Sequence, residues 1–280
     1  MTADPEVLEL VANVSLLFAE RPLLDRFTAA AEAGFAATEL WWPFDGPTPS
    51  EREVTALLSA VMGSGIPLAG MNLWAGNMPG GERGVLSQPV HTPAFRASLG
   101  VSARVAETTG CRVFNALYGQ RLPTETPEDQ DSTALDNLAY ATSMLGTNGG
   151  TVLLEPLSVG LNGAYPLQTV ADILPIVRRV RELTGGDHIA LLFDTFHLAN
   201  NGEDLVTAID AAADLIGHVQ FADSPGRGEP GTGHIDFPVV LEGLWGVGYR
   251  GAIACEYVPT VPTLDTLGWV AGMPHLRGIA

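Results

Sequence analysis

Three carboxylates and one amide each end a run of apolar residues in the second half of the chain. They are Glu155, Asp194, Gln220 and Glu256. Side chains alternate along a β-strand, so if the neighbouring apolar residues of each run pack against helices, the polar residue at its end points to the opposite face. Parallel strands bring such ends to one rim, where catalytic residues concentrate. We therefore expect these four groups to converge.

Three carboxylates and an amide oxygen at one rim predict a site for a hard divalent cation such as Mg²⁺ or Mn²⁺. Without a cation, the crowded carboxylates would repel one another and their pKa values would rise. The predicted metal ligands are Glu155, Asp194, Gln220 and Glu256, with coordination positions left for water or substrate. The alternative is that each group is an ordinary strand-end residue in contact with water. The agreement of four positions favours the shared site.

Polar residues that could bind a substrate lie near these strand ends. Arg227 and Glu229 belong to a loop, residues 224–236, that is dense in Gly and Pro. A guanidinium in such a loop can form paired hydrogen bonds with a carboxylate. His197 follows Asp194 by three residues, in a segment expected to be a loop, and could bind a substrate oxygen or support a metal ligand. We predict that His197, Arg227 and Glu229 bind substrate; the alternatives are a structural histidine and a surface arginine.

The elements that must position these residues alternate regularly. Apolar segments of strand length are expected at residues 8–18, 35–42, 66–73, 112–117, 151–155, 189–194, 216–222 and 252–257. Helical segments are expected at residues 23–33, 49–64, 93–109, 127–145, 167–183, 203–214, 238–245 and 263–270. Nearly continuous apolar strands that alternate with helices are typical of a parallel sheet covered on both faces. Eight such units predict an α/β fold, a closed (β/α)₈ TIM barrel, with residues 1–280 as a single domain.

An open doubly wound sheet is the structural alternative. Its dinucleotide-binding members carry a glycine-rich fingerprint after the first strand, whereas residues 15–22 contain no glycine.

Two polar sites within the expected elements are predicted to have structural roles. Glu39 lies among apolar residues of the second strand and is expected to belong to a buried supporting network. Ser50 and Glu53 have the spacing of a capping box at the start of the second helix.

Composition and charge exclude several classes of function. The formal net charge of -18 disfavours binding to nucleic acid or to an anionic membrane. All 14 basic residues are arginine, and Schiff-base aldolases, pyridoxal phosphate enzymes and P-loop nucleotidases need a lysine amine. Those classes are therefore excluded. The negative charge instead fits a small neutral or metal-chelated substrate. The two cysteines, Cys111 and Cys255, lack metal-type spacing, so neither a disulfide framework nor a cysteine zinc site is expected.

The sequence also bears on location and partners. No apolar run reaches the ~20 residues of a membrane span, and the N-terminal residues lack the pattern of a signal peptide. We therefore expect a cytoplasmic protein with no membrane partner. Assembly into a homo-oligomer is left open by the sequence.

Six stretches match the pattern of a known family: Asn13-Val-Ser-Leu-Leu-Phe, Leu24-Asp-Arg-Phe, Ala33-Gly-Phe, Gly81-Glu-Arg-Gly, Leu154-Glu-Pro, and the most specific run, Gln220-Phe-Ala-Asp-Ser-Pro-Gly-Arg-Gly-Glu-Pro-Gly-Thr-Gly. With them the chain resembles the hydroxypyruvate isomerase family over nearly its whole length. That family belongs to the xylose isomerase-like TIM barrels, which also include the ketose 3-epimerases. The resemblance implies that Glu155 and Glu256 transfer protons, and that Asp194 and Gln220 complete the metal site.

The reaction implied by the resemblance interconverts hydroxypyruvate, or a closely related short hydroxycarbonyl acid, with tartronate semialdehyde. One carboxylate would remove a proton, a cis-enediolate would form, and the second carboxylate would return a proton to the neighbouring carbon. A ketose 3-epimerase or other sugar isomerase with the same site is the alternative. By the resemblance, the epimerases have histidine at the position of Gln220, so glutamine here favours the hydroxypyruvate isomerase branch. A barrel that only binds a sugar acid would be expected to lack one glutamate. The chain departs from the family pattern at Ser224 and His234, which bears on the identity of the substrate.

Overall fold

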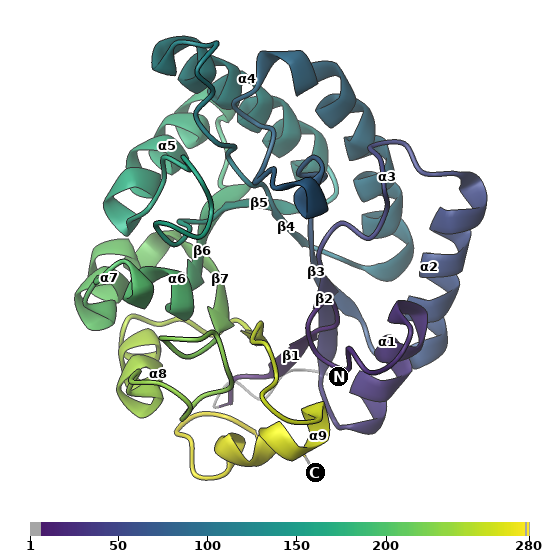
Figure 1. The fold of residues 1–280 in the computed structure, drawn as a ribbon, viewed down its shortest axis with the longest axis vertical. Helices are drawn as coiled ribbons and strands as arrows, with labels where there is room; N and C mark the ends of the chain where they lie inside the picture. The colour runs from purple at the N-terminus through teal and green to yellow at the C-terminus, as the bar shows by residue number, and fades with distance from the viewer. Residues whose placement is uncertain (1–6, 278, 280) are drawn as a thin grey trace.

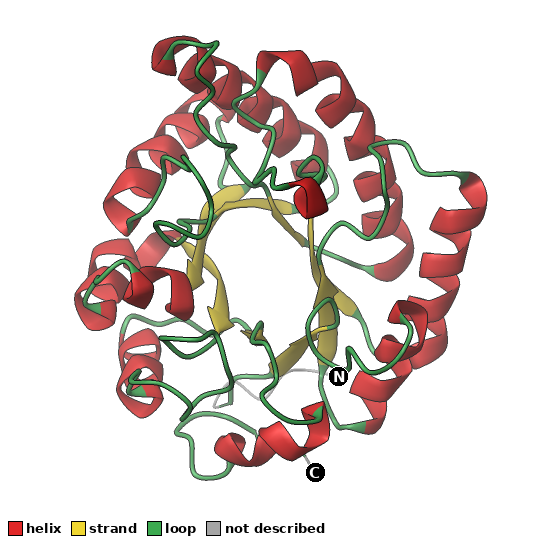
Figure 2. Ribbon diagram, in the orientation of Figure 1, coloured by secondary structure: helices red, strands yellow, loops and turns green. Residues whose placement is uncertain are grey.

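The structure, a computed structural model, describes residues 7–277 and 279. Within this part of the chain, eight parallel strands close into a barrel in sequence order, and helices surround it (Figure 1, Figure 2). The strands are β1 (Leu10–Asn13), β2 (Ala37–Leu40), β3 (Leu68–Asn72), β4 (Val113–Asn115), β5 (Thr151–Leu154), β6 (Ile189–Asp194), β7 (Ile216–Phe221) and β8 (Ile253–Cys255). The predicted (β/α)₈ barrel is therefore confirmed.

The helices follow the strands along the chain. The α-helices are α1 (Leu23–Glu32), α2 (Glu51–Ser64), α3 (Thr92–Thr109), α4 (Pro127–Gly146), α5 (Val170–Thr184), α6 (Thr195–Asn200), α7 (Leu205–Ala212), α8 (Phe237–Gly246) and α9 (Thr263–Thr266). Short 3₁₀ helices are η1 (Met78–Gly80), η2 (Pro89–His91), η3 (Ala213–Leu215) and η4 (Leu267–Val270). Among the described residues, none of these helices has both the length and the apolar composition needed to cross a membrane.

The first strand is shorter than the apolar run that predicted it. The run extends to Phe18, but β1 ends at Asn13 and the chain then turns. Leu17 and Phe18 are nevertheless buried, so the apolar character there reflects a buried turn and not a longer strand. The Arg26 side chain stabilises this turn by donating hydrogen bonds to backbone carbonyls within it.

Alternate residues of the strands fill the barrel interior. Two groups of apolar side chains are buried there, one from each half of the barrel: Val11, Ala37 and Ala254, then Leu153, Ala190 and Leu192. Two positions beyond Val11, Ala37, Ala254, Leu153 and Leu192, at or just past the strand ends, the residues are polar: Asn13, Glu39, Glu256, Glu155 and Asp194. Because side chains on a strand alternate with a period of two, these polar residues also face the barrel axis, at its carboxyl end.

A bulge in β7 determines which of its residues face inward. Asp194 pairs directly with Gln220, but earlier in the two strands the register shifts by one residue at Gly217. Because of this shift, His218 and Gln220 face the interior together with Asp194. A Cβ atom at Gly217 would lie 2.5 Å from the Cβ of Ala190, so a larger residue cannot fit there without displacing the interior packing.

Helix α2 begins with the predicted capping box. The Ser50 hydroxyl accepts a hydrogen bond from the Glu53 backbone, and the Glu53 carboxylate accepts one from the Ser50 backbone at 2.8 Å. Helix α5 begins with the same arrangement of Thr169 and Asp172. Satisfying the free N–H groups in this way fixes where each helix starts, and therefore the length of the loop that precedes it.

Candidate active site

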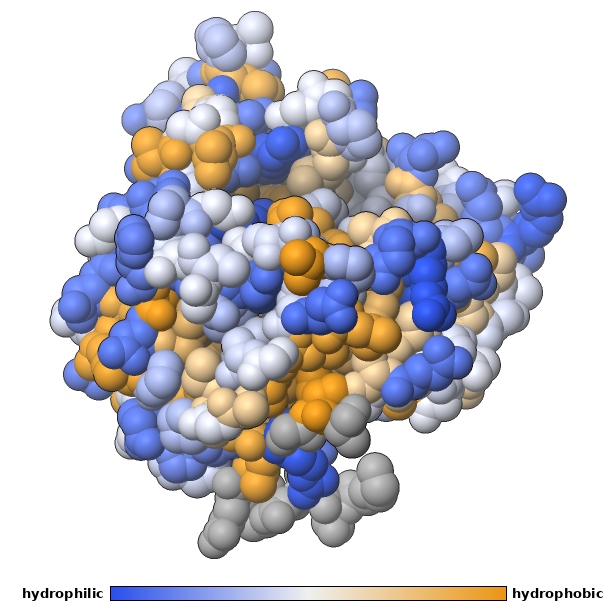
Figure 3. Space-filling view, turned by 60° about the horizontal axis from the view of Figure 1, so that its bottom comes forward, coloured by the Kyte–Doolittle hydropathy of each residue, from blue (hydrophilic) through white to orange (hydrophobic). Residues whose placement is uncertain are grey.

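The four polar residues predicted to converge lie at the carboxyl end of the barrel. Glu155 and Glu256 directly follow β5 and β8, Asp194 is the last residue of β6, and Gln220 lies beside it in β7. All four are buried, with no more than 4% of any of these residues exposed. The face of the molecule in Figure 3 is mixed in character: hydrophobic residues lie beside a hollow in the upper half of the view and also form patches in its lower half.

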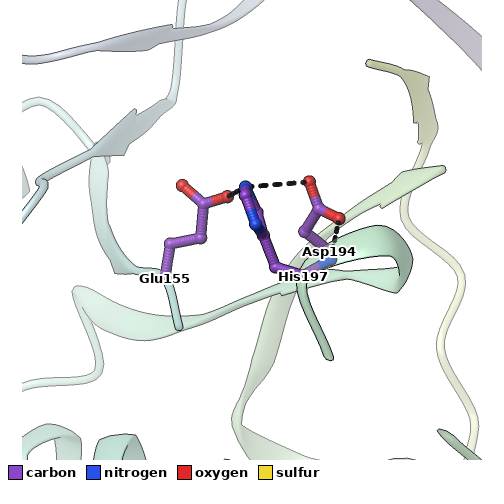
Figure 4. Close-up of side chains that lie close together, drawn as sticks. All are labelled: Glu155, Asp194 and His197. Carbon is purple, nitrogen blue, oxygen red and sulfur yellow. Dashed lines mark hydrogen bonds and ion pairs between the residues drawn. The ribbon is translucent and has the colours of Figure 1, made fainter. Parts of the chain in front are cut away.

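Glu155, Asp194 and His197 form a close group (Figure 4). Each offers one ligand atom, and these atoms all lie within 4.8 Å of one another, which is close enough to hold a metal ion. His197 Nε2 lies 3.6 Å from Glu155 Oε1 and 4.0 Å from Asp194 Oδ2. The imidazole edge therefore faces both carboxylates.

The other ring nitrogen of His197 indicates how this residue acts. The backbone N–H of Ser158 donates to Nδ1 at 3.0 Å, and the Ser158 hydroxyl lies 2.7 Å from the same atom. Burial lowers the pKa of His197 to about 4, so the ring is neutral at pH 7. A neutral ring whose Nδ1 accepts a hydrogen bond carries its proton on Nε2. His197 consequently presents an N–H donor to the carboxylates and to any oxygen between them, and the better metal ligands are the oxygens.

The expectation that His197 lies in a loop is wrong. It belongs to helix α6, whose N-cap is Asp194. Asp194 Oδ1 accepts a hydrogen bond from the His197 backbone N–H at 3.0 Å. Aspartate is a preferred N-cap residue, and its position directly before Thr195-Phe-His-Leu was the available signal for this short helix.

The buried oxygen atoms at this rim fit a divalent cation. Asp194 Oδ2 and Gln220 Oε1 are buried without a hydrogen-bond partner among the described residues. An unsatisfied buried acceptor is costly, and oxygen atoms of this kind are the ligands that Mg²⁺ and Mn²⁺ prefer. The donor set is therefore suited to the predicted cation.

Glu155 and Glu256 have different hydrogen-bond partners. Glu155 Oε2 accepts from Asn115 Nδ2 at 2.6 Å. Glu256 Oε1 accepts from Trp41 Nε1 at 2.7 Å and from Asn13 Nδ2 at 3.1 Å. Each carboxylate is thus held by amide or indole donors, which fix its orientation in the barrel.

Burial shifts both glutamates towards the protonated form. Burial and the nearby charges of Glu256 and Asp194 raise the pKa of Glu155 well above its usual value. Burial, together with the charges of Asp194 and Glu39, raises the pKa of Glu256 to about 8, although the guanidinium of Arg227 opposes the shift. Carboxylates with pKa values near the working pH are suited to accepting and returning protons.

Arg227 reaches into the site from the loop after β7. Its Nη2 lies 2.6 Å from Glu256 Oε2 and 3.8 Å from Asp194 Oδ2. The guanidinium carbon also lies 5.5 Å from the centre of the Phe196 ring. About a fifth of the Arg227 side chain is exposed, so it is not the free surface arginine of the alternative interpretation.

A buried aspartate that the sequence analysis did not single out organises this loop. Asp223 is fully buried, and its carboxylate accepts hydrogen bonds from four backbone N–H groups of the loop, at 2.8 to 3.0 Å. Glu229 lies elsewhere in the loop, where its carboxylate accepts from the backbone N–H and the hydroxyl of Thr260. It thereby ties the loop to the segment after β8, and its role in substrate binding stays a prediction.

Asn13, Asn115 and Trp41 were also not predicted as site residues. Asn13 and Asn115 are the last residues of β1 and β4, but the predicted strands continued to residues 18 and 117, so neither asparagine was recognised as a strand end. Trp41 directly follows β2, and its indole N–H donates to Glu256. Glu39 belongs to a buried network, as expected, and accepts from Asn13 at 2.9 Å.

Comparisons with known proteins agree with this geometry. Residues 27–277 match the family model described as xylose isomerase-like TIM barrel. The chain is 44% identical to a putative hydroxypyruvate isomerase of Streptomyces coelicolor, covering 92% of this chain and 94% of the relative. It is 30% identical to the hydroxypyruvate isomerase of Escherichia coli (94% and 98% covered) and 31% identical to a 2-oxo-tetronate isomerase of Pectobacterium atrosepticum (93% and 96% covered).

Among solved structures, the chain is similar to an AP endonuclease, family 2, from Brucella melitensis. The TM-score is 0.85 at 29% identity, with 94% of this chain and 98% of that chain covered. A D-psicose 3-epimerase structure has a TM-score of 0.70 at 18% identity, covering 89% and 85%, and supports the fold alone. From the barrel, the rim carboxylates and these relatives, we conclude that the chain belongs to the xylose isomerase-like TIM barrel family and is an enzyme of the isomerase class.

Proposed function

We propose that this enzyme interconverts hydroxypyruvate and tartronate semialdehyde, or a closely related short hydroxycarbonyl acid. The observation that carries the proposal is the pair of buried glutamates with raised pKa values, Glu155 and Glu256, at one barrel mouth beside a guanidinium. The names of relatives at 30 to 44% identity support the same reaction class.

The two glutamates transfer the proton. One carboxylate removes a proton from the hydroxyl-bearing carbon of the substrate, leaving a cis-enediolate. The other glutamate, in its protonated form, delivers a proton to the neighbouring carbon, and the hydroxyl proton moves to the former carbonyl oxygen. The net result is an isomer with no change in total oxidation state. A raised pKa allows each glutamate to exist in the form that its step requires.

The polar groups around the glutamates orient the substrate. Arg227 can hold the substrate carboxylate through N–H groups that do not contact Glu256. His197 Nε2–H points towards the space beside Glu155 and can donate to a substrate oxygen. A divalent cation held by Glu155, Asp194, Gln220 and Glu256 would supply positive charge to the enediolate oxygens.

A longer acid is the second candidate substrate, because the matching relatives include 2-oxo-tetronate isomerases at 31 and 32% identity. The test is turnover by the purified protein in D₂O, followed by proton NMR, with hydroxypyruvate, 2-oxo-tetronate and D-fructose as parallel substrates. We expect isomerisation of an acid with deuterium incorporated at the reacting carbon. Turnover of D-fructose alone would replace the proposal with a ketose epimerase.

A further inference from the structure

A buried carboxylate outside the proposed chemistry links two parts of the barrel beneath the site. Glu39 of β2 is 3% exposed. Its Oε1 accepts hydrogen bonds from Asn13 Nδ2 at 2.9 Å and from Gln220 Nε2 at 2.7 Å. Its Oε2 lies 2.7 Å from His218 Nε2. Glu39 therefore joins β2 to β1, its neighbour, and to β7, which is not its neighbour in the sheet.

The contact with Glu39 determines which way the Gln220 amide points. The end of an amide that lies 2.7 Å from a carboxylate oxygen must be its NH₂ group, because a carbonyl there would bring two acceptors together. The carbonyl oxygen of Gln220 is consequently turned away from Glu39. That oxygen is buried without a partner among the described residues, as is Oδ2 of Asp194, the residue paired with Gln220 in the sheet.

Glu39 orients the Asn13 amide in the same way. Asn13 Nδ2 has two hydrogens, and it donates to Glu39 Oε1 at 2.9 Å and to Glu256 Oε1 at 3.1 Å. The NH₂ group must therefore lie between the two carboxylates. A single buried carboxylate thus sets the direction of two amides: that of Gln220, a predicted metal ligand, and that of Asn13, which donates to a glutamate proposed to transfer protons.

We propose that Glu39 is a positioning residue that turns the carbonyl oxygen of Gln220 towards the cation site and an N–H of Asn13 towards Glu256. The inference rests on the proposed function, since it takes Gln220 as a ligand and Glu256 as a proton-transfer group. His218 holds the second oxygen of Glu39 and prevents the carboxylate from rotating. The competing explanation is a buried water, because a cavity of about 10 Å³, roughly the space of one water, is lined by Glu39, His218 and Gln220.

The first test is the substitution Glu39→Gln, which keeps the shape of the side chain. An amide at this position can present its own NH₂ group to Gln220, so the direction of the Gln220 carbonyl is no longer determined. We expect the metal-free Glu39→Gln variant to bind Mn²⁺ about 10- to 100-fold more weakly than the metal-free wild-type protein, the range typical for loss of a residue that orients a ligand. Isothermal titration without substrate measures this affinity. The matched control is Glu203→Gln, whose carboxylate accepts a hydrogen bond from the Val170 backbone outside the barrel and should leave Mn²⁺ binding unchanged.

The second test is rescue by exchange of the two groups. In the double variant Glu39→Gln/Gln220→Glu, the amide stands on β2 and the carboxylate on β7. An oxygen then faces the cation site whichever way the amide turns, so we expect Mn²⁺ affinity to recover most of what Glu39→Gln lost. A role limited to stabilising the fold predicts that the double variant recovers its unfolding temperature, because a carboxylate–amide pair is restored, but not its Mn²⁺ affinity. Thermal unfolding of each variant shows whether the fold is retained.

Several outcomes would overturn the inference. Unchanged Mn²⁺ affinity in Glu39→Gln would mean that the Gln220 oxygen serves the small cavity instead. A double variant as weak as the single one would reduce Glu39 to a structural role. Failure of the wild-type protein to bind Mn²⁺ would also overturn it, whereas turnover of hydroxypyruvate by the same preparation would leave the proposed function standing. The expected affinity pattern without turnover of any acid would support the positioning role and refute the function.

Discussion

Replacing Arg227 by lysine separates its two roles. In the structure one guanidinium nitrogen contacts Glu256 Oε2 at 2.6 Å, and a lysine ammonium can keep the charge near that carboxylate. What lysine lacks is the planar fork that could bind a substrate carboxylate at the same time. A lost hydrogen bond to a charged group costs about 1.5–3 kcal/mol. At about 1.4 kcal/mol per factor of ten, KM for an acid substrate should rise by roughly 10- to 150-fold.

Steady-state kinetics of Arg227→Lys with hydroxypyruvate and with a neutral ketose measure this effect. Only the acid carries a carboxylate, so KM for the ketose should change much less. Arg104→Lys is the matched control, because Arg104 forms an exposed ion pair with Glu51 on the outside of the barrel. An equal change in KM for both substrates, or no change for hydroxypyruvate, would refute the carboxylate-binding role of Arg227.

Three further predictions concern catalysis, pH and packing. Glu155→Gln and Glu256→Gln should each lower kcat by about 100-fold or more with the fold intact, and kcat above about a tenth of wild type would contradict the paired mechanism. The metal-free protein should lose stability as pH rises from about 5 to 8: the pKa of Glu256 is about 8 when folded and ~4.3 when unfolded, so the unfolded chain releases this proton first. At about 1.4 kcal/mol per pKa unit, the contribution of Glu256 to this loss of unfolding free energy has an upper limit of roughly 5 kcal/mol. Urea unfolding at pH 5 and pH 8 should show a smaller loss in Glu256→Gln than in the wild-type protein. Equal losses in the two proteins would exclude Glu256 as a cause. Gly217→Ala should destabilise by about 1–3 kcal/mol through overpacking, whereas Gly100→Ala, whose Cβ would meet nothing within 4 Å, should not; equal unfolding midpoints for the two variants would contradict the close packing at Gly217.

The sequence alone determined the barrel and the inward direction of its polar strand ends. Both depend on local patterns: eight apolar segments alternate with helices, and side chains on a strand alternate with a period of two. That period places Glu155 on the same face as Leu153, and Leu153 lies in the barrel interior. The capping box at Ser50 is equally local, since its partners are three residues apart. Such features could be predicted because neighbours in the chain determine them.

Only the tertiary structure decided how the polar groups partner one another. Glu39 and Gln220 are 181 residues apart, and they meet because the barrel closes and a bulge at Gly217 turns Gln220 inward. The apolar run through Phe18 indicated burial correctly but not the turn that it forms, because hydrophobicity reports what is buried and not the backbone path. The pairing of Arg227 with Glu256 likewise depends on a loop that Asp223 folds back over the barrel mouth through four backbone hydrogen bonds. Contacts of this kind have no periodic signature in the sequence, because they arise between segments that come together only when the chain has folded.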